Sequence, residues 1–349
     1  MRDRSIDVGR GLLVIMMVYG HVMQFFGDSQ IFPLVGTMID VINLTVFPTF
    51  VFYFGATAVL AYLKKPYLQA LPGMLRTTLR AYAVFCLSGV GYRVLRENKA
   101  FSVGTVRRVM QLHDIPGWSE FLISFTLYGL LLIVGYAVFD FLSRKPMACL
   151  FVSALCVCSC LVVPYGEIPT HLALLIGGRN FSYFPIVQYM PYFLCGMLYS
   201  QGDRRTRRML FVVAVVSSLG GVAHWHFFGF PGRFPPEWGW ILLPAVLVGA
   251  VVLLSRALCG MAGNGIGKIA DALCGVLGHF GGASLYYLLG SNLVLFTLAG
   301  KGAAPAMARK SVLPWTLPIQ SPQGAACWTA VLLLALWFVA RLGGRGKGR

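Results

Sequence analysis

The sequence predicts an all-α protein, a polytopic bundle of about ten transmembrane helices with both termini in the cytoplasm. Of its 349 residues, 57% are hydrophobic and 12% are charged, whereas soluble domains carry about 25% charged residues. The mean hydropathy is +0.73, and no strand alternation typical of a membrane barrel is seen. Apolar runs of spanning length lie at about 9–26, 44–63, 77–95, 119–142, 147–165, 183–200, 209–227, 238–255, 282–299 and 325–341.

The distribution of basic residues predicts the orientation. With both termini inside, 19 of the 29 Lys and Arg residues fall in cytoplasmic segments and 10 outside, as the positive-inside rule requires. The cluster Arg204–Arg208 is the strongest anchor. The net charge of +17 is therefore interpreted as anchoring to anionic headgroups, because no basic stripe interleaved with aromatic residues suggests nucleic acid. We expect one integral-membrane domain over 1–349.

Two terminal features and one loop bear on this topology. Residues 1–26 lack the small-residue cleavage site of a signal peptide. Only Leu342–Arg349 follow the last apolar run, so any periplasmic transferase domain is expected in a separate chain. The loop 93–118, outside in this topology, is strongly basic. Either the third helix is misplaced, or the loop is an external surface for an anionic acceptor.

The first apolar run contains an arginine and a histidine on one helix stripe. Arg10 and His21 are eleven residues apart, which is three turns plus about 20°, or roughly 16 Å along the axis. An ionisable group within a membrane helix faces a partner or a wet cavity. His21 is therefore a candidate for proton transfer, the alternative being a structural histidine bonded to a neighbouring helix. Asp7 and Arg10 are three residues apart, close enough to pair.

A second basic group precedes the third apolar run. Arg76 and Arg80 stand at i and i+4, so their guanidinium groups share one helix face. Such a pair suits phosphate or pyrophosphate, with Lys64 and Lys65 enlarging the positive patch. The alternative is topological charge or contact with lipid headgroups.

Other polar groups are weaker candidates. Glu120, at the start of the fourth run, could orient a histidine, accept a sugar hydroxyl or pair with an arginine, and His113-Asp114 precedes it. His224 and His226 are two residues apart and so point to different sides of a helix. The nine cysteines lie almost entirely in apolar runs and are interpreted as packing residues. We expect no metal site, and the glycines of 263–267 follow no strand, which disfavours a dinucleotide site.

Several motifs resemble the membrane-bound acyltransferase family 3, which includes glycan O-acetyltransferases and a fucose-acetylase-like group. Ile6–Gly11 followed by Gly20–Val22 is similar to the family's first helix, in which Asp, a basic residue and Gly precede a histidine. Pro48–Gly55 resembles its second helix, and Leu63–Arg80 its arginine-bearing loop, although three residues rather than two separate the arginines here. Further segments that resemble family helices are Trp118–Leu122, Pro191–Gly196 and Gly282–Leu288.

This resemblance implies an O-acyltransferase of the bacterial inner membrane. It would move an acyl group, with acetyl the expected one, from acyl-CoA to a hydroxyl of an envelope or extracellular polysaccharide or a lipid-linked glycan. A polysaccharide synthesis or export complex is a further expected partner. The candidate catalytic residues are His21, as base or acyl relay, with Asp7 and Glu120. The candidate donor-binding residues are Arg10, Arg76 and Arg80. The alternatives are a glycan or glycolipid transporter or flippase, and an N-acyltransferase acting on an amino sugar.

Overall fold

The computed structural model describes residues 3–163, 165–166, 168–178, 184–261, 267–300 and 318–345. The regular elements within these ranges are helices, as the sequence predicts. Their main buried apolar cluster contains side chains from the first helix to the last.

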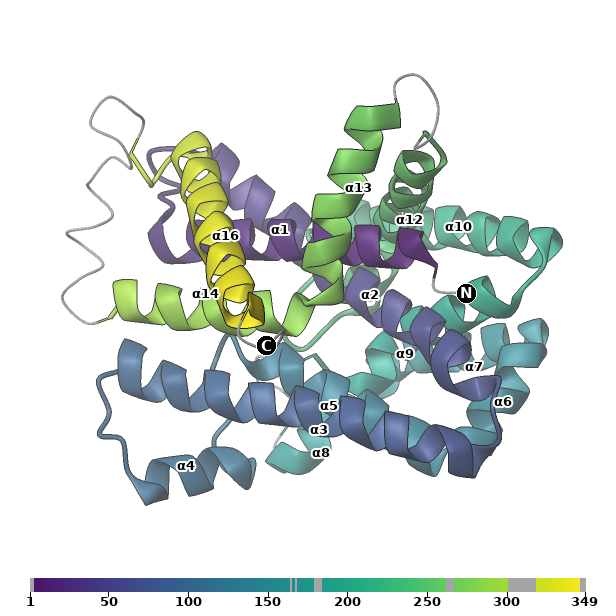
Figure 1. The fold of residues 1–349 in the computed structure, drawn as a ribbon. Helices are drawn as coiled ribbons and strands as arrows, with labels where there is room; N and C mark the ends of the chain where they lie inside the picture. The colour runs from purple at the N-terminus through teal and green to yellow at the C-terminus, as the bar shows by residue number, and fades with distance from the viewer. Residues whose placement is uncertain are drawn as a thin grey trace.

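Helix α1, Arg4–Phe26, lies at the centre of the fold. Its N-terminus is capped by Asp3, whose Oδ1 accepts a hydrogen bond of 2.9 Å from the Ser5 backbone N–H. Figure 1 shows α13 and α16 crossing α1 steeply, and α14 running alongside it. The helices that pack against α1 are α2 (Leu34–Ala58), α12 (Ala245–Met261), α13 (Gly267–Gly282), α14 (Ser284–Leu298) and α16 (Pro322–Arg345).

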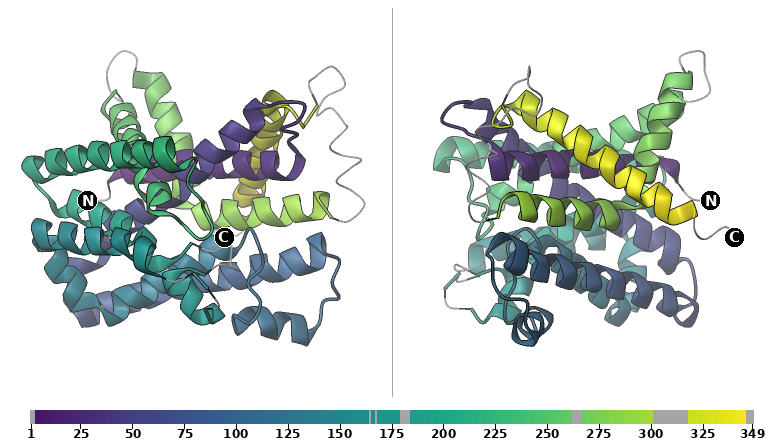
Figure 2. Two further views of the ribbon diagram at one scale, coloured as in Figure 1. Left: turned by 180° about the vertical axis from the view of Figure 1, so that it is seen from behind. Right: turned by 60° about the vertical axis from the view of Figure 1, so that its left-hand side comes forward.

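A second group of helices lies on the far side of α14 and α2. In Figures 1 and 2, α14 runs between α1 and α3, which agrees with its contacts to both helices. In this group α3 packs on α5, α2 on α9, and α9 on α7, while α10 packs on α11 and α12. The longer members are α3 (Tyr67–Gly91), α5 (Glu120–Val134), α7 (Pro146–Val162) and α9 (Ile186–Gln201). Helix α10 (Arg204–Phe228) lies beside α12, at the level of α1 (Figure 1). The shorter elements are η1 (Val59–Leu63), η2 (Tyr92–Arg96), α4 (Val103–Met110), α6 (Tyr136–Arg144), α8 (Thr170–Ile176) and α11 (Trp238–Leu242).

The described helices have the lengths and composition of a multi-pass membrane protein. Five segments are long and apolar enough to cross a membrane: Arg4–Phe26, Leu34–Leu63, Arg204–Phe228, Trp238–Met261 and Pro322–Leu342. Two bent pairs of helices raise the number to seven, α5 with α6 at 88° and α13 with α14 at 75°.

The predicted count of about ten spans differs from this finding for identifiable reasons. Each predicted apolar run lies largely on a helix, but α7 and α9 have 17 and 16 residues, fewer than the roughly 20 that cross a bilayer. The run 119–142 is not one straight helix, because the backbone leaves the helical conformation at Gly135 (φ −94°, ψ 19°). Helix α3 begins at Tyr67, well before the predicted start, and so includes more polar sequence.

Glycines allow α1 and α13 to approach at backbone distance. A Cβ atom on Gly281 would lie 1.8 Å from the backbone oxygen of Asp7, and one on Gly11 would lie 2.0 Å from that of Leu277. Small residues at helix crossings are a common packing device in membranes, where apolar burial gives no driving force between helices. This contact fixes α13, and the bend after it, against the first turns of α1.

We expect Gly281→Ala to destabilise the protein. Its new methyl group would overlap backbone rather than a movable side chain, and overpacking of this kind costs about 1–3 kcal/mol or more. The matched control is Gly275→Ala in the same helix, where an added Cβ meets nothing within 4 Å and helix propensity favours alanine. Thermal unfolding in detergent should show a lower midpoint for Gly281→Ala only. Equal midpoints for the two variants would contradict the close crossing.

Candidate functional site

The predicted functional histidine is bonded to an asparagine on another helix. His21 lies on α1, and its Nδ1 is 3.0 Å from Oδ1 of Asn292 on α14. Asn292 is fully buried, whereas the His21 ring is half-buried. His21 therefore makes the interhelical hydrogen bond expected of a structural histidine. A functional role for His21 depends on what surrounds the rest of its ring.

The hydrogen bonds of Asn292 fix which ring nitrogen carries the proton. Its Nδ2 donates to the Trp118 carbonyl at 3.1 Å and to Ser88 Oγ at 3.2 Å. Because a carbonyl only accepts, the amide must present its Oδ1 to the histidine. His21 Nδ1 is then the donor, and in the neutral ring Nε2 keeps its lone pair.

Trp118 connects this asparagine to a second pair of amides. Its indole Nε1 donates to Gln24 Oε1 at 2.9 Å, and Gln24 Nε2 donates to Asn43 Oδ1 at 3.2 Å. The Trp118 backbone is left-handed (φ +59°), a conformation that persists in such a residue only where its surroundings determine it. Its indole ring stacks on Phe25 at 4.6 Å and on Tyr92 at 5.8 Å between ring centroids.

His21 also lines a small cavity. The cavity volume is about 50 Å³, enough for ordered water or a small polar group. Among the described residues, His21 has no hydrogen bond at Nε2. The cavity walls are mainly apolar, with a few polar groups from α1, α2 and the α10–α11 loop. Its lining residues are Met17, Gly20, His21, Gln24, Ile42, Asn43, Val46, Phe47, Phe50, Phe121, Phe184 and Arg233.

Arg233 is the cation of this cavity. It lies in the loop between α10 and α11, with its guanidinium 5.0 Å from the ring centroid of Phe184 and 4.5 Å from that of Phe234. Its Nε is buried without a hydrogen-bond partner among the described residues. Burial lowers the pKa of Arg233 from its usual value, and nearby acidic groups, including Glu120 and Asp40, oppose this shift. The side chain stays protonated because an arginine pKa is so high, so a positive charge lies beside His21.

Glu120 is near this arginine rather than bonded to the histidine. It is the first residue of α5, as predicted, and its Oε2 is buried without a hydrogen-bond partner among the described residues. Since Asn292 occupies Nδ1 of His21, the orienting role considered for Glu120 belongs to Asn292. The Glu120 carboxylate acts electrostatically on Arg233.

The predicted donor-binding arginines lie elsewhere. Arg10 is half-buried on α1 and donates to Ser284 Oγ at 3.5 Å. Arg76 and Arg80 are exposed on α3. None of the three lines the His21 cavity. Asp7 is half-buried in the first turn of α1, at the close crossing with α13.

The basic loop 93–118 is partly paired within itself. Arg93 forms a two-pronged ion pair with Asp114 and a further bond to Glu97, and Lys99 lies 3.1 Å from Glu97. Arg107 and Arg108 remain exposed on α4. The third helix continues directly into the π-helical turn η2, which ends at Arg96, close to the predicted end. The ion pairs partly neutralise the basic segment that begins there.

The remaining candidates do not converge on a site. His224 is buried, with Nε2 3.4 Å from Glu237 Oε2, while His226 is exposed, which confirms that the two imidazoles point apart. Among the described residues, no three His, Cys, Asp or Glu side chains are grouped to hold a metal ion. All nine cysteines are free thiols. The glycine-rich stretch 263–267 lies almost wholly outside the described residues.

Sequence reasoning missed Asn292 and Arg233. Asn292 is a lone asparagine in an apolar helix, which is a signal of an interhelical hydrogen bond, but nothing in the sequence names its partner. Arg233 is surrounded by aromatic residues and prolines in the sequence of its loop. That composition is the only signal that separates it from the topological arginines.

Comparison with known proteins adds no family assignment. No protein-family model matches the chain, and no curated protein matches it in sequence. The conclusions below therefore depend on the site and on the sequence motifs.

We expect the His21 ring to be the Nδ1–H tautomer at any pH at which the imidazole is neutral. In ¹⁵N-histidine NMR of the full-length protein in micelles, a resonance that disappears in His21→Gln should show a protonated Nδ1 and an unprotonated Nε2. Asn292→Leu removes the acceptor that selects this tautomer, so the two tautomers should then mix. His226→Gln, at an exposed position, is the control. An Nε2–H tautomer in the unmodified chain would contradict the geometry.

Proposed function

We propose that this protein is an integral-membrane O-acyltransferase in which Nε2 of His21 accepts the proton of an acceptor hydroxyl. The observation that carries the proposal is the Asn292 bond, which leaves Nε2 unprotonated on a ring that lines a largely apolar cavity within a helical membrane protein. The motifs similar to the membrane-bound acyltransferase family 3 supply the reaction class.

The proposed reaction is an attack of a hydroxyl on a thioester. The acceptor oxygen bonds to the acyl carbon while His21 Nε2 takes the hydroxyl proton. The C–S bond then breaks, and the imidazolium returns the proton to the departing CoA sulfur. A positioned base contributes roughly 10²–10⁴-fold to such a step. If His21 instead relays the acyl group, Nε2 is again the reacting atom, so both routes require the same tautomer.

Arg233 supports this chemistry by its charge. Negative charge develops on the thioester oxygen during the attack, and a cation in a largely apolar cavity stabilises it more strongly than one in water. The buried, unpartnered Nε of Arg233 is a donor available for that oxygen. Glu120 then acts as a positioning residue that holds the guanidinium electrostatically. The cavity accommodates only the reacting ends of the two substrates, so their larger parts lie outside it.

Arg10, Arg76 and Arg80 are proposed to bind the donor, with Asp7 at the same end of α1. Exposed guanidinium groups at i and i+4 suit the phosphates of acyl-CoA. The proposal places the protein in the bacterial inner membrane with about ten spans, both termini in the cytoplasm, and acetyl-CoA as donor. The proposed acceptor is an envelope or extracellular polysaccharide, or its lipid-linked precursor, made by an associated synthesis or export complex.

We expect His21→Gln to reduce acyl transfer by roughly 10²–10⁴-fold, the contribution of a general base. The measurement is release of CoA thiol from acetyl-CoA by purified full-length protein with envelope glycan present, together with base-labile acetate on the glycan. Base treatment separates an ester from the amide that an N-acyltransferase would form. His226→Gln, an exposed histidine, should leave transfer unchanged. Normal acylation by a folded His21→Gln variant would remove this residue from the mechanism.

Arg233→Gln and Arg76→Gln should have different kinetic effects. We expect the first to lower kcat by about 10²–10³-fold, as the loss of a transition-state donor does, with KM for acetyl-CoA little changed. The second should raise that KM with kcat little changed, because it removes ground-state binding. An Arg233 variant altered only in KM would overturn its assignment to the reacting oxygen.

A transporter or flippase is a second candidate that one observation favours. Helices α13 and α14 are bent by 75° at the break between Gly282 and Ser284, in the same bent pair that carries Asn292, and discontinuous helices commonly form transporter binding sites. Purified protein that neither hydrolyses acetyl-CoA nor transfers its acetyl group, but moves a glycan or glycolipid across proteoliposomes, would support this alternative.

A further inference from the structure

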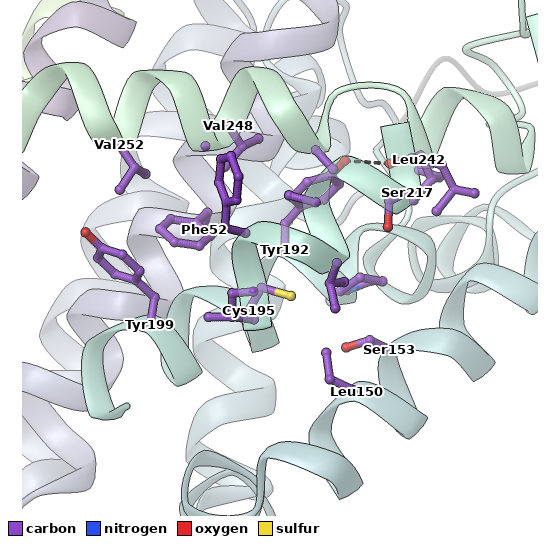
Figure 3. Close-up of a pocket in the computed structure, with 18 of the residues that line it drawn as sticks. Phe52, Leu150, Ser153, Tyr192, Cys195, Tyr199, Ser217, Leu242, Val248 and Val252 are labelled. Carbon is purple, nitrogen blue, oxygen red and sulfur yellow. Dashed lines mark hydrogen bonds between the residues drawn. The ribbon is translucent and has the colours of Figure 1, made fainter. Parts of the chain in front are cut away.

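A second, much larger cavity lies away from His21. It occupies about 500 Å³, within the roughly 300–1,000 Å³ typical of small-molecule sites. Figure 3 shows it beneath α12, with Phe52 and Tyr192 toward its centre and Leu150 on the opposite wall. The side chains come from α2, α7, α9, α10, α11 and α12, and most are aliphatic or aromatic. None of the residues that line the His21 cavity lines this one.

Part of the cavity wall is formed by exposed side chains of α10 and α12. Two of its lining residues, Phe211 on α10 and Leu253 on α12, are 52% and 56% exposed. Both helices are among the segments apolar enough to span a membrane. Their exposed apolar faces therefore meet lipid chains in a bilayer, and the cavity is accessible from that side.

Two arginines line the cavity around one tyrosine. The guanidinium groups of Arg207 and Arg256 each lie 5.4 Å from the ring centroid of Tyr199. Arg207 also donates from Nε to the Tyr199 carbonyl at 3.2 Å. Neither arginine takes part in an ion pair with a carboxylate among the described residues. The site thus joins a large apolar space to two planar cations without an ion-pair partner among the described residues.

We propose that this cavity binds an anionic phospholipid, with one acyl chain in the apolar space and the phosphate between Arg207 and Arg256. Guanidinium groups bind phosphate oxygens in a bidentate way, and basic pockets between membrane helices are suited to anionic lipid headgroups. The walls lack the polar groups that a nucleotide would need along its length. This inference is independent of the proposed acyl transfer.

The proposed site for the lipid acyl chain can be tested by filling the cavity with a larger side chain. Gly249 on α12 lines the cavity, and a Cβ there meets nothing within 4 Å, so Gly249→Phe places a ring in the chain's path. Gly260→Phe, on the same helix and equally open but outside the cavity, is the control. Native mass spectrometry of delipidated full-length protein titrated with phosphatidylglycerol should show a bound lipid that Gly249→Phe loses and Gly260→Phe keeps. If Gly249→Phe does not fold, Gly249→Met serves the same purpose.

The proposed site for the lipid phosphate can be tested by changing the charge of the lipid headgroup and of the two arginines. The unmodified protein should prefer phosphatidylglycerol over phosphatidylcholine of the same chain length. Arg207→Gln and Arg256→Gln should each weaken phosphatidylglycerol binding about tenfold, the cost of one charged contact, and should weaken phosphatidylcholine binding less, because its choline cation already offsets the phosphate charge. Arg208→Gln removes the same charge from an exposed neighbour outside the cavity and should have no effect.

Three results would overturn the lipid site. They are retention of phosphatidylglycerol by a folded Gly249→Phe variant, equal affinity of the unmodified protein for the two phospholipids, and displacement of the lipid by acetyl-CoA at lower concentration. The last would assign the cavity to the donor. Loss of acyl transfer with lipid binding intact would instead concern only the His21 site, so the two proposals fail separately.

Discussion

The hydrogen bond between His21 and Asn292 is the constraint on which the site depends. It joins α1 to α14 within the packed core, and the same asparagine bonds to Ser88 on α3 and to the Trp118 carbonyl before α5. A buried polar group of this kind is costly unless all its partners are present. The four segments must therefore take their places together, and His21 has a defined tautomer only when they do.

The helical class and much of the first helix follow directly from the sequence. Apolar runs mark the helices, since a bilayer forces backbone groups to pair within each segment. The spacing of Arg10 and His21 puts them on one helix stripe. The sequence does not indicate that the hydrogen-bond partner of His21 is Asn292, 271 residues further along the chain. Periodicity gives the buried face of a helix but not the helix that covers it.

The sequence likewise does not indicate where the helices bend. The run through Gly135 is continuous in hydropathy, yet the chain turns there by 88°, at a backbone conformation (φ −94°, ψ 19°) that other residues also adopt. Arg233 could not be separated from the many topological arginines, because its distinction is burial among aromatic rings. Arg207 likewise belongs to a cluster that the sequence explains fully as topological charge, whereas its contact with Tyr199 singles it out.

Beyond His21, the chain of hydrogen bonds through Trp118, Gln24 and Asn43 is made of side-chain amides, a backbone carbonyl and an indole. Ion pairs in the same position would weaken with ionic strength and with protonation of their acid. Hydrogen bonds between these neutral groups are weakened neither by ionic strength nor by protonation of an acid. The hydrogen-bonded scaffold around the histidine should therefore keep its shape across changes in salt and external acidity, so that such changes reach the site through its charged and titratable groups, His21, Arg233 and Glu120.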